Sequence, residues 1–86
     1  MNNLKVPSFE SRRARINCMD DISIEIQKAK NYVAYVRRIG RKAPTLEEKI
    51  QIRKKLEEAQ SVVMKLRRSY FDIEDELVLK SGGRNG

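Results

Sequence analysis

The chain has 86 residues, with 19 Lys and Arg against 12 Asp and Glu, a net charge of +7, and neither His nor Trp. This length suits one small domain and excludes several, and the single cysteine, Cys18, excludes an intramolecular disulfide and a cysteine-based zinc site. Because no stretch approaches the ~18 apolar residues that span a bilayer, and the N-terminus lacks the apolar run of a signal peptide, we expect a cytoplasmic or nucleoid-associated protein with no membrane partner.

The first part of the chain predicts a flexible arm and then a long helix. Residues 1–7 are broken by Pro7, and Ser8 or Ser11 is suited to cap a helix by accepting a hydrogen bond from a free amide in its first turn. Over the expected helix, residues 9–39, apolar side chains recur at alternating steps of three and four, which is the spacing of a coiled-coil seam. They are Met19, Ile22, Ile26, Ala29, Val33 and Val36.

A turn is predicted over residues 40–44. Gly40 suits the left-handed conformation that ends many helices, and Pro44 cannot continue a helix. Thr45 then opens a capping box, in which its hydroxyl accepts a hydrogen bond from the Glu48 amide while the Glu48 carboxylate reaches back. One helix therefore ends and another begins within five residues.

The second helix is expected over residues 45–79, followed by a flexible tail at 80–86. It carries a second seam with the same spacing. The seam residues are Ile52, Leu56, Ala59, Val63, Leu66, Tyr70, Ile73 and Leu77.

The two seams fit each other in one antiparallel register. Val33 is expected opposite Ile52, and Ile22 opposite Val63, with the bend between residues 42 and 43. The sequence therefore predicts an all-α fold in which residues 8–79 form a two-helix antiparallel coiled-coil hairpin. At the open end, basic residues of the first helix are expected to form ion pairs with acidic residues of the second. The two groups are Arg12, Arg13 and Arg15, and Asp72, Glu74, Asp75 and Glu76.

Basic residues gather at the bend. Between residues 37 and 55 there are eight basic side chains against two acidic ones, a net +6 of the chain's +7. Such a cluster is suited to neutralise the phosphates of DNA or RNA. The other interpretation is a solvated, charge-rich end of a coiled coil, since no groove-reading motif accompanies the charge. The candidate nucleic-acid-binding residues are Arg37, Arg38, Arg41, Lys42, Lys49, Arg53, Lys54 and Lys55.

A second set of apolar side chains lies outside both seams. A two-helix hairpin cannot bury them by itself, and exposed apolar stripes usually mark an interface. We expect the hairpin to form a four-helix bundle by dimerisation, or to dock on a larger protein; scattered surface apolar residues are the alternative. The candidate interface residues are Ile50, Met64, Phe71, Val78, Tyr32 and Ile39.

The sequence does not favour an enzyme. It has no histidine, no glycine-rich phosphate loop and no metal-ligand spacing, so we expect no catalytic residue, cofactor or metal site. The acidic residues 72–76 point in different directions on a helix and lack a flexible oxygen-rich loop, and Cys18 is expected as a small apolar side chain near the seam.

The segments 41–50 and 66–77, which begin Arg41-Lys42-Ala43-Pro44 and Leu66-Arg67-Arg68-Ser69, carry a family resemblance. They resemble the helical hairpin appended to the C-terminal side of some bacterial Snf-type helicase-like ATPases. The ATPase motifs of that family are absent, so the resemblance implies only a hairpin that works beside nucleic acid or a nucleic-acid machine.

These observations lead to two functional hypotheses. The first is a non-enzymatic interaction module in a nucleic-acid context, whose basic tip contacts phosphates and whose outer apolar stripe contacts a second copy or a larger protein. The alternative is a purely protein-directed inhibitor, assembly factor or structural subunit, for example of a virus or mobile element, whose basic tip meets an acidic protein surface.

Overall fold

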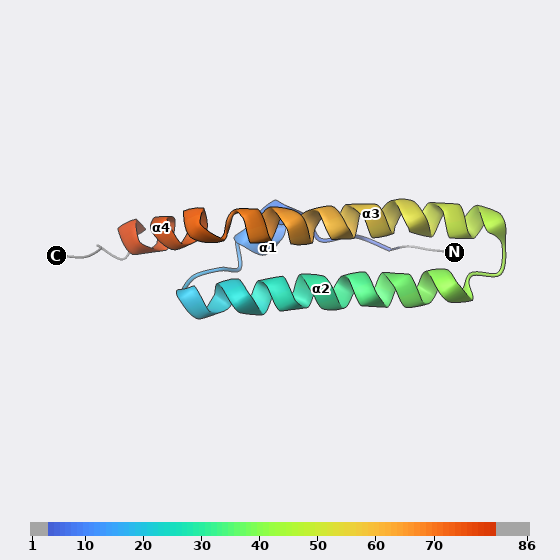
Figure 1. The fold of residues 1–86 in the computed structure, drawn as a ribbon, viewed down its shortest axis with the longest axis horizontal. Helices are drawn as coiled ribbons and strands as arrows, with labels where there is room; N and C mark the ends of the chain where they lie inside the picture. The colour runs from blue at the N-terminus through green and yellow to red at the C-terminus, as the bar shows by residue number, and fades with distance from the viewer. Residues whose placement is uncertain (1–3, 81–86) are drawn as a thin grey trace.

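A computed structural model describes residues 4–80, and in this part of the chain the backbone forms four helices and no strand. The long helices α2 and α3 lie side by side and run antiparallel, and α4 continues along the line of α3 (Figure 1). The elements make a rod 59 Å long and 18 by 15 Å across. The predicted all-α class is confirmed, with four helices where the sequence predicted two. The helices are α1 (Phe9–Arg13), α2 (Met19–Lys42), α3 (Leu46–Arg68) and α4 (Tyr70–Lys80).

Residues 43–45 connect α2 to α3. Thr45 is the N-cap of α3, and its hydroxyl accepts a hydrogen bond from the Glu48 amide at 3.1 Å. This bond satisfies one of the free amides in the first turn and is the first half of the predicted capping box. Glu47 and Glu48 also place negative charge beside the positive end of the helix dipole. The start of α3 is therefore determined locally.

Gly40 does not end α2, contrary to the prediction, because the helix continues to Lys42. It lies instead where α2 passes close to α3: a Cβ atom at this position would be 3.3 Å from Cγ2 of Ile52. A glycine that ends a helix and one that permits close approach of two helices look the same in a sequence. The connection between the two helices therefore covers residues 43–45, whereas the sequence predicted residues 40–44.

The register of α2 against α3 also differs from the predicted one. Ile52 was expected opposite Val33, but it lies against Gly40 and lines a surface groove together with Val36. Val33 lines a neighbouring groove with Val63 instead. The predicted register is therefore wrong: Ile52 lies against Gly40, seven residues further along α2 than the expected Val33. A shift of one heptad keeps apolar residues facing each other, so the seam spacing alone does not exclude it.

The predicted continuous helix over residues 9–39 is also wrong. α1 ends at Arg13, residues 14–18 form a connection, and α2 begins at Met19. The start of α1 is capped as predicted, since the Ser8 hydroxyl accepts a hydrogen bond from the Ser11 amide at 3.0 Å. Near the start of α2, the Asp21 carboxylate accepts a hydrogen bond from the Asn17 amide at 3.0 Å. The connection turns the chain back so that α1 packs against α3.

The N-terminal segment, which we define as residues 4–16, is packed against the long helices. It was predicted as a flexible arm as far as residue 7, but Val6 contacts the core and the Tyr32 hydroxyl donates a hydrogen bond to the carbonyl of Lys5 at 3.1 Å. Residues 1–3 of the predicted arm lie outside the described residues.

The expected second helix over residues 45–79 is divided at Ser69, which forms a turn between α3 and α4. Helical hydrogen bonds reach Ser69 from both sides: its amide donates to the Lys65 carbonyl at 3.0 Å, and its carbonyl accepts from the Ile73 amide at 2.8 Å. The two helices therefore act as one rod with a small local irregularity. α4 extends to Lys80, and residues 81–86 of the predicted tail lie outside the described residues.

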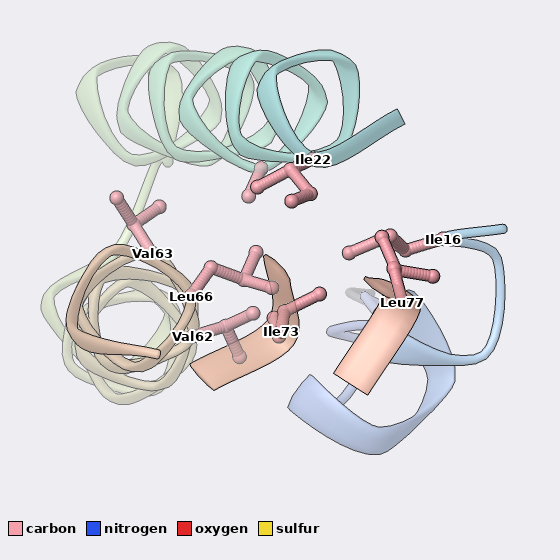
Figure 2. Close-up of a cluster of buried hydrophobic side chains, with 8 residues drawn as sticks. Ile16, Ile22, Val62, Val63, Leu66, Ile73 and Leu77 are labelled. Atoms are coloured by element: carbon pink, nitrogen blue, oxygen red, sulfur yellow. The ribbon is translucent and has the colours of Figure 1, made fainter. Parts of the chain in front are cut away.

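The core is built from three layers instead of two. In Figure 2, Ile22 of α2, Leu66 of α3 and Ile16 of the N-terminal segment point toward one another. Val62, which lies outside the predicted seam, is buried because Val6 and Phe9 of the N-terminal segment pack on that side of α3. The buried cluster consists of Ile16, Ile22, Ala29, Val62, Val63, Leu66, Ile73 and Leu77.

A buried ion pair attaches α1 to α2. Arg12 Nη1 lies 3.1 Å from Glu25 Oε1, and the two side chains are only 6% and 4% exposed. Lys28 Nζ lies 3.6 Å from the other Glu25 oxygen. Arg12 therefore does not pair with α4 as predicted, whereas Arg13 does contact Glu76 of α4. The fold-back places Arg12 against α2, and the sequence pattern contained no sign of this placement.

Candidate interaction surfaces

The α2–α3 pair has two sides, and the N-terminal segment covers one of them (Figure 1). On the covered side, Val6 and Arg12 lie against Tyr32 and Ala59. Val33 is the next residue along α2 and therefore points about 100° away, toward the other side of the pair. That other side carries two adjoining surface grooves and is open among the described residues.

The larger groove lies beside the bend and has a volume of about 520 Å³. Four basic side chains line it, two from each helix, and each pair is four residues apart, a spacing that places both members on one side of their helix. Its apolar lining comes from Val36, Ile52 and Leu56. We call this surface the basic groove. Its basic residues are Arg37, Arg41, Lys49 and Arg53.

The electrostatics of the basic groove favour an anion. Glu57 is the only acidic residue in its lining, against four cations, so the lining carries a net charge of +3. Arg53 Nε lies 4.0 Å from Glu57 Oε2, but the two side chains are 78% and 70% exposed. An ion pair with this exposure contributes little and does not remove the positive potential. The groove therefore has unneutralised positive charge over an apolar floor.

The structure separates the eight basic residues that the sequence grouped together. Arg37, Arg41, Lys49 and Arg53 come together in the basic groove. The other four do not line it. Arg38, Lys42 and Lys54 are exposed elsewhere, and Lys55 is half-buried with its Nζ 4.0 Å from Glu58.

The second groove continues the first toward the middle of the rod. It has a volume of about 330 Å³ and shares Arg37 and Gln60 with the basic groove. Lys30, Val33 and Met64 also line it. Lys30 and Gln60 were not predicted, because both lie outside the charge-rich window of residues 37–55. The seven-residue step from Lys30 to Arg37 is the sequence signal that places both on one side of α2.

The candidate protein interface is only partly exposed. Ile50, Met64 and Phe71 are 50%, 57% and 74% exposed. Val78 and Ile39 are half-buried. The exposed members follow one another at seven- and fourteen-residue steps along α3 and α4. We call this surface the outer stripe.

Tyr32, another of the candidate interface residues, packs against the N-terminal segment. It is half-buried against the N-terminal segment, and its hydroxyl is bonded to the carbonyl of Lys5. Burial raises its pKa, with a further contribution from Tyr35, while Arg12 acts in the opposite direction. Tyr32 therefore serves to hold the N-terminal segment in place.

Cys18 and the acidic residues do not form a metal-binding group in residues 4–80. Cys18 is exposed at the N-cap of α2, not near the seam as predicted, because the chain turns at this point. Within the same residues, no three His, Cys, Asp or Glu side chains come together as a metal site would require. What the surface does offer is a charged groove and an apolar stripe.

Comparison with known proteins found no match to this chain among protein-family models, curated proteins or solved structures.

Proposed function

We propose that this protein is a non-enzymatic helical interaction module that works beside nucleic acid, in the cytoplasm or at the nucleoid. The basic groove contacts phosphates, and the outer stripe contacts protein, either in a four-helix bundle made by dimerisation or on a larger partner. The observation that carries this proposal is the convergence of four cations from two helices, Arg37 and Arg41 with Lys49 and Arg53, on one groove with a single carboxylate.

The chemistry of the basic groove fits a phosphate backbone. Arg37, Arg41 and Arg53 present planar guanidinium groups, which bind phosphate oxygens through paired hydrogen bonds. The binding is expected to be independent of sequence, since neither a recognition motif nor an aromatic side chain lines the groove. The resemblance of segments 41–50 and 66–77 to a hairpin of helicase-like ATPases favours the same context.

A specific feature favours a second candidate function, a purely protein-directed inhibitor, assembly factor or structural subunit. Val36, Ile52 and Leu56 give the basic groove an apolar floor. An amphipathic acidic helix would bury its apolar side there and pair its carboxylates with the surrounding cations. Phosphate contact alone does not require such a floor.

A salt-dependent gel shift with non-specific DNA and RNA tests the first function. At about 50 mM salt the native protein should bind, with an affinity that falls steeply as salt increases. The double variant Arg37→Glu/Arg41→Glu should lose at least tenfold in affinity, and the salt slope should fall by about two, because each lost phosphate contact removes about 0.9 from the slope.

The matched control is Arg38→Glu/Lys42→Glu, which makes a similar change of charge on neighbouring exposed positions that do not line the groove. If both double variants weaken binding equally, overall charge and not the groove is responsible. If the native protein fails to bind either nucleic acid at about 50 mM salt, phosphate contact is excluded and the protein-directed function remains.

A further inference from the structure

We infer that the partner of the outer stripe is a second copy of this chain, docked antiparallel with a two-fold axis passing beside Met64. This inference rests on the protein contact of the proposed function and names its partner. A two-fold interface requires one surface that is complementary to itself. The outer stripe meets this requirement in its apolar residues and in its charges.

Two apolar residues are placed symmetrically about Met64. Ile50 and the half-buried Val78 lie fourteen residues before and after it, whereas Phe71, seven residues after it, has Glu57 as its counterpart seven residues before. Because α4 continues along the line of α3 (Figure 1) and Ser69 is hydrogen-bonded to both helices, the seven-residue steps keep these positions near one side of the rod. Antiparallel pairing about Met64 would therefore place Ile50 of one copy beside Val78 of the other, over about 42 Å of helix.

The charges are arranged with opposite sign about the same point. Arg53 lies eleven residues before Met64 and Asp75 eleven after, and both are exposed. In the antiparallel dimer each Arg53 would face the other copy's Asp75. In a parallel dimer each charged residue would instead lie beside the same residue of the other copy, and the two like charges would repel each other. The charge pattern therefore selects the antiparallel arrangement.

A second pair of charges follows the same rule. Glu57 is an acidic residue on the same half of the stripe as Arg53, and it lies seven residues before Met64. Arg68 is a basic residue on the same half of the stripe as Asp75; it lies four residues after Met64 and is exposed. Antiparallel pairing brings Glu57 of one copy within a helical turn of Arg68 of the other. The two exceptions to the charge pattern thus compensate each other across the interface.

Site-specific cross-linking tests this arrangement. In a Cys18→Ser background, which removes the native exposed thiol, Met64→Cys should form a disulfide-linked dimer on mild oxidation, because the two sulfur atoms meet at the axis. Phe71→Cys should react at least tenfold more slowly, because its two copies lie about 21 Å apart along the rods, far beyond disulfide reach. A mixture of Glu57→Cys and Phe71→Cys should link to each other.

Ile24→Cys is the control for random collision, because Ile24 is 48% exposed on α2 and lies outside the stripe. Equal reaction at Met64→Cys and Phe71→Cys would show a parallel dimer. Reaction of Met64→Cys no faster than Ile24→Cys would show that the stripe does not pair with itself. Either result overturns the inference.

Charge exchange tests the same interface by sedimentation equilibrium. Asp75→Arg should weaken dimerisation about tenfold, since two repulsive contacts arise in each dimer, and adding Arg53→Asp should restore it. The absence of rescue would overturn the register. Gel shifts with the Arg37→Glu/Arg41→Glu variant report on phosphate binding alone, so failure of the dimer and failure of the proposed function are distinguishable.

Discussion

At the scale of single residues, the Arg12–Glu25 ion pair is the contact whose contribution to stability depends most on burial. Both side chains are almost completely buried, and they are 3.1 Å apart. A buried ion pair of this kind is weak support for stability in itself, because desolvation of the two charges offsets their attraction. Loss of one partner is costly, because the other charge then stays buried without compensation.

We therefore expect Arg12→Met to lower the free energy of unfolding by about 3 kcal/mol. The double variant Arg12→Met/Glu25→Leu should recover most of this loss, because it buries no unpaired charge. Urea denaturation of the three proteins measures both values. If the double variant is as unstable as the single one, the pair contributes through packing and not through charge.

Asp21 makes the stability of the fold depend on pH in the acidic range. The Asn17 amide donates a hydrogen bond to its carboxylate, and this bond, which favours the ionised form, lowers the pKa of Asp21 from its ordinary value of 3.8. Because the folded pKa lies below the unfolded one, the stabilisation is complete above pH 3.8 and is lost as the pH falls through the folded pKa.

Asp21→Asn should accordingly show a smaller loss of stability than the native protein when the pH is lowered through and below 3.8. Thermal melts at a series of pH values measure this difference. Asp20→Asn is the control, since Asp20 is adjacent, exposed and also in the first turn of α2. Equal changes in both variants would mean that the helix dipole, not the Asn17 bond, is responsible.

At the scale of elements, the start of α3 depends on a single side chain. The Thr45 hydroxyl accepts a hydrogen bond from the Glu48 amide, and this N-cap fixes where α3 begins after the bend. Thr45→Ala should lower the free energy of unfolding by about 1 kcal/mol, because one amide of the first turn loses its partner. Thr45→Ser keeps the acceptor and should cost much less. Chemical denaturation of both variants checks this; equal losses would indicate that the Thr45 methyl group matters more than the cap.

The N-terminal segment acts as a third element for the α2–α3 pair. Val6, Phe9 and Ile16 cover a side of α3 that would otherwise expose Val62. A chain of this size gains little stability from two helices alone. The segment therefore supplies a third layer to the core and occupies one of the two sides on which another helix would pack.

At the scale of the whole molecule, the three surfaces of the rod have different roles. One side of the α2–α3 pair is covered by the N-terminal segment, the other carries the two grooves, and the outer stripe adjoins the groove side, since Met64 also lines the second groove. In the proposed dimer, Arg53 pairs with Asp75 of the other copy, so that phosphate contact relies on the remaining cations of the basic groove, Arg37, Arg41 and Lys49. The proposed dimer and the proposed phosphate contact are then compatible on one rod.

Part of this architecture was predictable because it depends on residues close together in the chain. Helical periodicity, the cap at Thr45 and the collection of basic residues near the bend each involve neighbours within a few positions. For the same reason the sequence correctly indicated an all-α fold and the exposure of Ile50, Met64 and Phe71. It grouped eight basic residues without distinguishing the four that line the groove.

Only the tertiary structure decided the fold-back of the N-terminal segment, the register of α2 against α3 and the composition of the basic groove. The contacts responsible join residues far apart in the sequence, such as Arg12 with Glu25 and the Tyr32 hydroxyl with the Lys5 carbonyl. A heptad seam accommodates several registers that differ by whole turns, since each brings apolar residues together. The selection among them comes from the close approach at Gly40 and from the layer that the N-terminal segment adds, and neither produces a periodic signal.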